Sequence, residues 1–103
     1  MNITINGTEY ALKYTFRALM IYEKIAGETF GGKGISEILI YFYSTILASN
    51  QDVTLTFDTF IDWLDENPNA LNDFSKWLAG VMGVNSYVRH NEPKTEGDGE
   101  KNV

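Results

Sequence analysis

The sequence predicts an α+β protein that is mainly α, in which an N-terminal β-hairpin packs on about four helices. Short β-branched and aromatic runs flank an Asn-Gly pair near the N-terminus, and apolar residues then recur at helical spacing. The chain has 103 residues, of which 44% are hydrophobic, enough for one buried core. We therefore expect a single globular domain over residues 1–84 and a disordered polar tail over residues 85–103.

The hairpin is expected over residues 2–14. Asn6-Gly7 separates Ile3-Thr4-Ile5 from a second run that ends at Tyr14. This dipeptide favours the positive φ angles of a type I′ turn. Because a two-stranded hairpin is marginally stable alone, we expect it to lie against the helices.

Two helices are expected after the hairpin, over about residues 16–26 and 36–48. Thr15 can accept a hydrogen bond from the first turn of the first helix, and Gly27 can end that helix. Ser36 is the expected cap of the second helix.

The second of these helices is apolar on nearly every side. One face carries Ile35, Ile38, Leu39, Phe42 and Ile46, and another carries Ile40, Tyr43 and Leu47. A helix of this kind is usually central in its domain. In a chain this small, the second face could instead contact a partner, so both interpretations stay open.

Two further helices are expected over residues 57–66 and about 68–82. Thr56 is the expected cap of the third, and Asn67-Pro68 both stops that helix and starts the fourth, which Gly83 ends. Trp63 and Trp77 flank their buried stripes, where a tryptophan either closes the core or anchors a partner. The candidate partner-binding residues are therefore Ile40, Tyr43, Leu47, Trp63 and Trp77.

Composition excludes several classes of function. The net charge is −6 and the basic residues are scattered, which argues against binding to nucleic acid. No apolar run approaches the roughly 20 residues of a membrane span. The absence of cysteine excludes disulfides and thiolate metal sites, and fits a cytoplasmic protein.

The segment around residues 48–59 looks like part of a calcium-binding loop, but only Asn50 and Asp52 fit its ligand positions and three other positions fail. In the best register, Ala48 occupies the first ligand position, Val53 the glycine position and Thr59 the position of the bidentate glutamate. The only histidine, His90, falls in the predicted tail, so no base is expected on the folded body. We expect no metal, no cofactor and no catalytic residue.

The N-terminal third resembles the tail assembly chaperones of long-tailed bacteriophages and their prophage relatives. A hairpin with Asn-Gly, "ITINGTEYALKYTF", leads into the helix "FRALMIYEKIAGETF". The matching residues are Phe16, Leu19, Glu23, Gly27 and Phe30. A helical remainder and a polar C-terminus agree with the family in outline.

This resemblance implies a non-enzymatic protein of the bacterial cytoplasm that acts in virion assembly. It would bind the long, hydrophobic, helical tape measure protein and keep it soluble while tail tube protein assembles around it. The partners implied are the tape measure protein and, as a second candidate, the tail tube protein. The alternative from the residues alone is a small structural or adaptor protein that forms a homo-oligomer through the same apolar surface.

Overall fold

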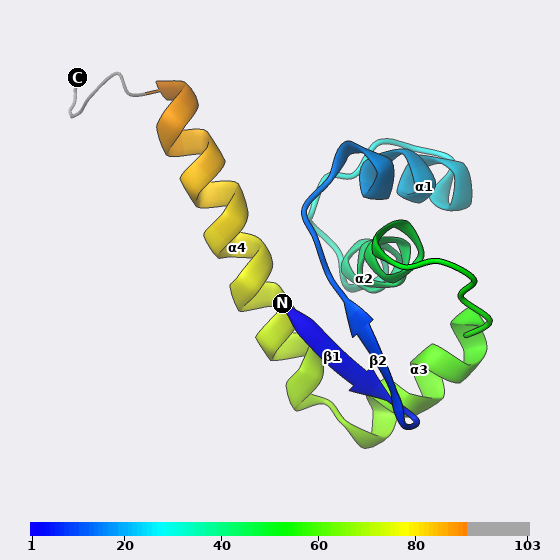
Figure 1. The fold of residues 1–103 in the computed structure, drawn as a ribbon. Coiled ribbons are helices and arrows are strands. Elements are labelled where there is room, and N and C mark those ends of the chain that lie inside the picture. Colours follow the sequence, from blue (N-terminus) through cyan, green and yellow to red (C-terminus); the bar gives the residue numbers. More distant parts are fainter. Residues whose placement is uncertain (91–103) are drawn as a thin grey trace.

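The fold combines one β-hairpin with four α-helices, as the sequence predicts (Figure 1). A computed structural model describes the backbone of residues 1–90 and the side chains of residues 1–83. The predicted tail beyond residue 90 lies outside the described residues. The elements are β1 (Asn2–Ile5), β2 (Thr8–Ala11), α1 (Phe16–Ala26), α2 (Ile35–Ser49), α3 (Phe57–Glu66) and α4 (Asn69–His90).

Helix α4 is longer than the sequence pattern predicts. It begins at Asn69 and continues through Gly83 to His90, so the predicted end at Met82 is wrong. The backbone of residues 85–90, which we expected in the tail, is helical. A glycine ends a helix when it takes the left-handed conformation, as Gly27 does at φ 78°, whereas Gly83 has no positive φ.

The hairpin forms with the expected turn. Asn6 and Gly7 have φ angles of 50° and 86°, and Ile5 pairs with Thr8 across the turn. The outer edge of β2 is held by Asn50, the C-cap of α2. Its Oδ1 accepts from Ala11 N at 3.0 Å and its Nδ2 donates to Ala11 O at 2.9 Å. Asn50 therefore replaces a third strand and fixes the hairpin to α2.

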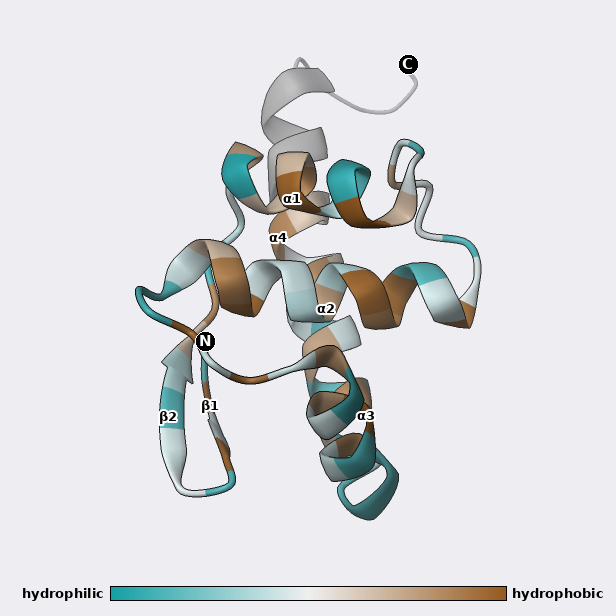
Figure 2. Cartoon of the chain, turned by 90° about the vertical axis from the view of Figure 1, so that its right-hand side faces the viewer, coloured by the Kyte–Doolittle hydropathy of each residue, from teal (hydrophilic) through white to brown (hydrophobic). Residues whose placement is uncertain are grey.

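Helix α2 lies at the centre of the fold, with α1 on one side and the hairpin and α3 on the other (Figures 1 and 2). Phe42 is fully buried, stacks on Phe74 of α4 at 4.1 Å between ring centroids, and meets Phe60 of α3 edge-on at 4.9 Å. Ser44 and Thr45 are also fully buried. Their hydroxyls donate to the carbonyl oxygens four residues earlier, at 2.7 and 2.9 Å, so both are satisfied within the helix.

The helix caps agree with two of the three predictions. Oγ1 of Thr15 accepts from Ala18 N, and Oγ1 of Thr56 accepts from Thr59 N, each at 3.1 Å. Ser36 is not a cap, because α2 already begins at Ile35 after Gly34. Instead, Oε1 of Glu37 accepts from Gly31 N and Gly32 N at 2.8 and 3.0 Å, which orders the preceding glycine-rich loop.

Candidate functional site

The five candidate residues predicted from the sequence lie in different parts of the molecule. All five side chains are half-buried, and four of them pack against the core. Ile40, Tyr43 and Leu47 lie along α2, whereas Trp63 belongs to α3 and Trp77 to α4. They do not come together as one continuous surface.

Tyr43 is engaged within the domain. Its ring lies 5.4 Å from Phe57 and 5.7 Å from Phe60, and its hydroxyl donates to Leu55 O at 2.6 Å. Burial raises the pKa of the Tyr43 hydroxyl, which therefore stays protonated and a donor at neutral pH. Tyr43 thus ties α2 to the start of α3.

The other four candidates have separate surroundings. Ile40 packs against the core. Leu47 lines a shallow hollow with Arg17. Trp63 lines a second hollow beside β1, and the Trp77 ring lies 5.6 Å from Phe74.

The most exposed large apolar side chains lie elsewhere, on α1 and at the start of α2. Phe16 is 85% exposed and Met20 is 61% exposed, and both lie on the outer side of α1. Ile35, the first residue of α2, is 62% exposed. The sequence showed that these residues are apolar, but the helical spacing alone did not separate them from their buried neighbours Ala18 and Tyr22.

Ile35 stands on the wall of an apolar hollow between the start of α2, the end of α3 and the start of α4. We call it the α2–α3 hollow, and its volume is about 270 Å³. Leu39 and Ile61 form part of its lining, and Asp65 is the one charged side chain in it. The hollow is lined by Ile35, Leu39, Ile61, Leu64, Asp65, Pro68 and Leu71.

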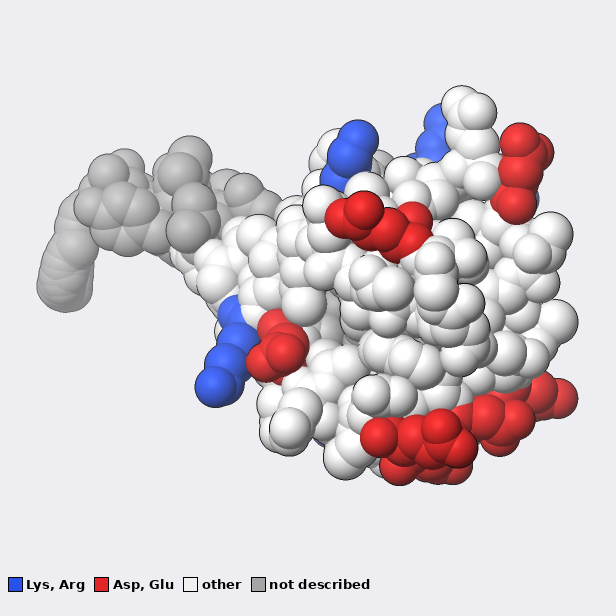
Figure 3. Space-filling model, turned by 60° about the horizontal axis from the view of Figure 1, so that its bottom comes forward, with Lys and Arg blue, Asp and Glu red and all other residues white. Residues whose placement is uncertain are grey.

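The outer side of α3 makes one border of this hollow acidic. Figure 3 shows acidic side chains gathered along one edge of the molecule. Helix α3 carries the exposed residues Asp58, Asp62, Asp65 and Glu66. An apolar segment entering the hollow would therefore meet negative charge beside it, which favours a segment with flanking Lys or Arg.

The described residues show no constellation for a metal ion or a membrane span. In residues 1–83, no group of three or more His, Cys, Asp or Glu side chains is placed to hold a metal. No helix within the described range combines the length and the apolar character needed to cross a bilayer. The described surface instead offers the apolar α2–α3 hollow and exposed apolar side chains.

The residues that carry the N-terminal resemblance have distinct structural roles. Leu19 packs against the core, Gly27 ends α1, and Phe30 stacks on Tyr41 at 4.5 Å. Phe16 and Glu23 are exposed. Comparisons with protein-family models, with curated proteins and with solved structures found no match. A function for this chain therefore rests on its own geometry and on this N-terminal pattern.

Proposed function

We propose that this protein is a non-enzymatic binding protein that holds an apolar helical segment of a client in the α2–α3 hollow. The observation that carries the proposal is Ile35, which is 62% exposed on the wall of an apolar hollow of about 270 Å³. A large aliphatic side chain so exposed beside a concave apolar surface marks a contact site. Covering both with a client side chain removes apolar area from water, at about 25 cal/mol per Å².

The expected binding mode is a helix laid into a groove. A client helix would present apolar side chains three and four positions apart, with one of them entering between Ile35, Leu71 and Ile61. The N-terminal resemblance supplies the class of client, the tape measure protein of a long-tailed phage. A long hydrophobic helical protein needs such cover until tail tube protein surrounds it, and the acidic surface of this domain would keep the complex soluble.

The test is co-expression of the full chain with a tape measure protein of a long-tailed phage, followed by measurement of the soluble fraction of that client. Ile35→Asp places a charge on the wall of the hollow, and should return the client to the insoluble fraction. Met20→Asp is the matched control, because Met20 is 61% exposed but lies on α1. This control should leave the client soluble.

Two results would overturn the proposal. The first is a client whose solubility does not depend on this protein at all. The second is an equal loss of client solubility with Ile35→Asp and Met20→Asp, which would mean that a charge anywhere on the apolar surface is enough to abolish client binding. A stable closed oligomer of the protein alone that Ile35→Asp dissociates would favour the self-associating structural protein instead.

A further inference from the structure

The outer edge of β1 has backbone groups that the hairpin does not use. Leu12 N donates to Met1 O at 2.7 Å and Met1 N to Leu12 O at 3.3 Å, so these two residues form a hydrogen-bonded pair. Bonded and non-bonded pairs alternate in an antiparallel ladder, so Asn2 and Thr4 direct their backbone groups away from β2. On β2, Ala11 likewise faces outward, and Asn50 pairs with it. Among residues 1–83, no side chain pairs with the outer edge of β1 in this way.

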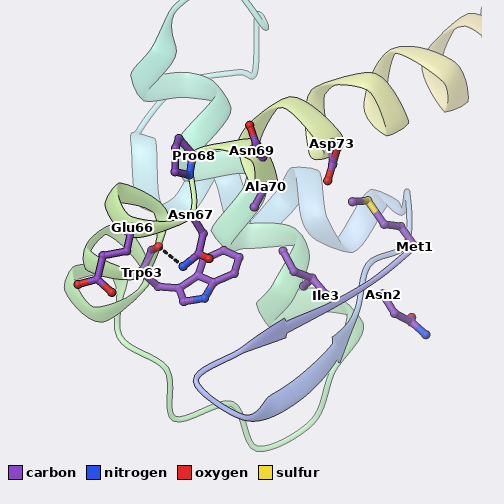
Figure 4. A pocket seen from close by; sticks show the side chains of 10 residues that line it. All are labelled: Met1, Asn2, Ile3, Trp63, Glu66, Asn67, Pro68, Asn69, Ala70 and Asp73. Atoms are coloured by element: carbon purple, nitrogen blue, oxygen red, sulfur yellow. Dashed lines mark hydrogen bonds between the residues drawn. The ribbon is translucent and has the colours of Figure 1, made fainter.

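A hollow of about 320 Å³ lies beside this uncovered edge (Figure 4). One wall is the start of the chain, Met1 to Ile3, and the opposite wall is the corner between α3 and α4. Trp63 is half-buried there, and the side chain of Asn67 donates to its carbonyl oxygen at 2.9 Å. The edge of a strand and a helix therefore face each other across a gap, which is the geometry that accepts an added strand.

The lining of this hollow selects for a basic side chain. Trp63, Ile3 and Ala70 provide apolar wall, along which the aliphatic stem of a lysine or arginine can lie. Asp73 points from α4 toward the side of the hollow formed by Met1, and Glu66 lies at the opposite end, beyond Trp63, with its carboxylate turned outward (Figure 4). Among residues 1–83 no Lys or Arg lines the hollow, and the positive charge on its lining is the Met1 α-ammonium, which donates to Leu12 O. An aromatic face with one carboxylate at either end favours a segment that carries basic side chains.

We propose that β1 binds an extended segment of a partner protein by β-strand addition, with Lys or Arg side chains of that segment along Trp63, one toward Asp73 and another toward Glu66. The main-chain hydrogen bonds would come from Asn2 and Thr4, and alternate side chains of the segment would enter the hollow. This site lies across the α3–α4 corner from the α2–α3 hollow and takes a strand rather than a helix. The two hollows share only Pro68 of their lining, so each can be tested with variants of its own.

The probe is the blocked peptide acetyl-Thr-Lys-Thr-Lys-Thr-Lys-Thr-amide, and the readout is the fluorescence of Trp63 in the full chain. Trp77→Phe makes Trp63 the only tryptophan, since the chain has two. We expect saturable binding that weakens as salt is added. The same peptide with Glu in place of Lys should bind at least about tenfold more weakly, as should one methylated on the alternate backbone nitrogens that face β1.

Variants of the protein separate the strand edge from the charge. Thr4→Pro removes the outward N–H without touching a bond to β2, and should lower affinity about tenfold, while Thr4→Val should not. The double variant Asp73→Asn, Glu66→Gln should lower the affinity for the lysine peptide several-fold and make it depend less on salt. The control Asp58→Asn, which neutralises another exposed acid, should do neither. Ile35→Asp should leave peptide binding unchanged, whatever happens to the client.

Three results would overturn the proposal. If the lysine peptide does not bind, the proposed site does not exist. If the N-methylated peptide binds as tightly as the unmethylated one, strand addition is wrong, and this result stands even if Thr4→Pro fails to fold. If the glutamate peptide binds as tightly as the lysine peptide, the proposed preference for a basic side chain is wrong. Light scattering tests whether a second copy of the chain occupies the edge of β1 instead. A dimer of the chain alone that Thr4→Pro dissociates would show that it does.

Discussion

Helices α1 and α2 are both rich in apolar residues, yet the structure treats them differently. Helix α2 contacts neighbours on both sides and buries Tyr41, Phe42 and Ile46 completely. Helix α1 packs mainly against α2, so only one side of it is covered, and Phe16 and Met20 face outward. The same kind of residue therefore closes the core in one helix and remains exposed to solvent in the other.

This difference shows that position in the fold decides which apolar face is buried. A helix in the middle layer has a neighbour on each side, whereas an outer helix has a neighbour on one side only. The uncovered apolar side chains of an outer helix cost stability if they meet water, and they are retained only where that cost is small or contact requires them. Mutations that remove apolar groups from each helix test this division directly.

The largest expected effect is Phe42→Ala, at the centre of α2. Removing a fully buried ring that stacks on Phe74 leaves a cavity among α2, α3 and α4, and we expect a loss of about 3–5 kcal/mol in the free energy of unfolding. Urea titration followed by circular dichroism measures it. A loss below about 1 kcal/mol would show that the core relaxes around the site and that α2 is not its centre.

A smaller effect is expected from Tyr41→Phe, which removes a buried hydroxyl that has no hydrogen-bond partner in the described part of the chain. At neutral pH we expect the free energy of unfolding to be unchanged or raised by up to about 1 kcal/mol, because an unpaired polar group leaves the core. Tyr10→Phe, at a half-buried strand position, is the matched control and should change the free energy of unfolding little. Leu39→Phe does not serve as a control, because it adds side-chain volume instead of removing a hydroxyl.

The same residue makes stability depend on pH. Burial raises the pKa of Tyr41 from 10.0 to about 12, so the unfolded chain loses this proton first as pH rises. The free energy of unfolding is therefore independent of this group well below pH 10 and falls between about pH 10 and 12, by about 1.4 kcal/mol per pH unit. Urea midpoints from pH 8 to 11 should fall less steeply for Tyr41→Phe than for the wild type. Equal slopes would contradict the assignment.

The sequence was sufficient for the parts of the fold that depend on local backbone chemistry. Asn6-Gly7 specified the turn, Thr15 and Thr56 specified helix starts, and Gly27 specified a helix end, because each effect acts within a few residues. The prediction that Gly83 ends α4 was wrong, because a glycine can also continue a helix when no left-handed turn is formed. Asn50 was missed, because its bonds to Ala11 join residues 39 positions apart.

The candidate sites were harder to predict than the fold. Ile35 and Leu39 were assigned to one apolar face of α2, but no sequence pattern showed that α3 and α4 would leave a hollow against them. Trp63 was a candidate from its position at a stripe edge, whereas the free edge of β1 that faces it depends on the pairing register. Both sites arise from the packing of distant elements, which periodicity within one element does not report.

The smallest expected effect is on the outer side of α1. Phe16→Ser and Met20→Ser remove side chains that are 85% and 61% exposed, so each should change the free energy of unfolding by less than about 0.5 kcal/mol. Leu19→Ser is the control on the same helix, because Leu19 packs against the core and its loss should cost about 1–3 kcal/mol. Urea titration of the three variants compares the two sides of α1. A cost at Phe16 as large as that at Leu19 would mean that the outer side of α1 is covered in solution, and the contrast with α2 would then disappear.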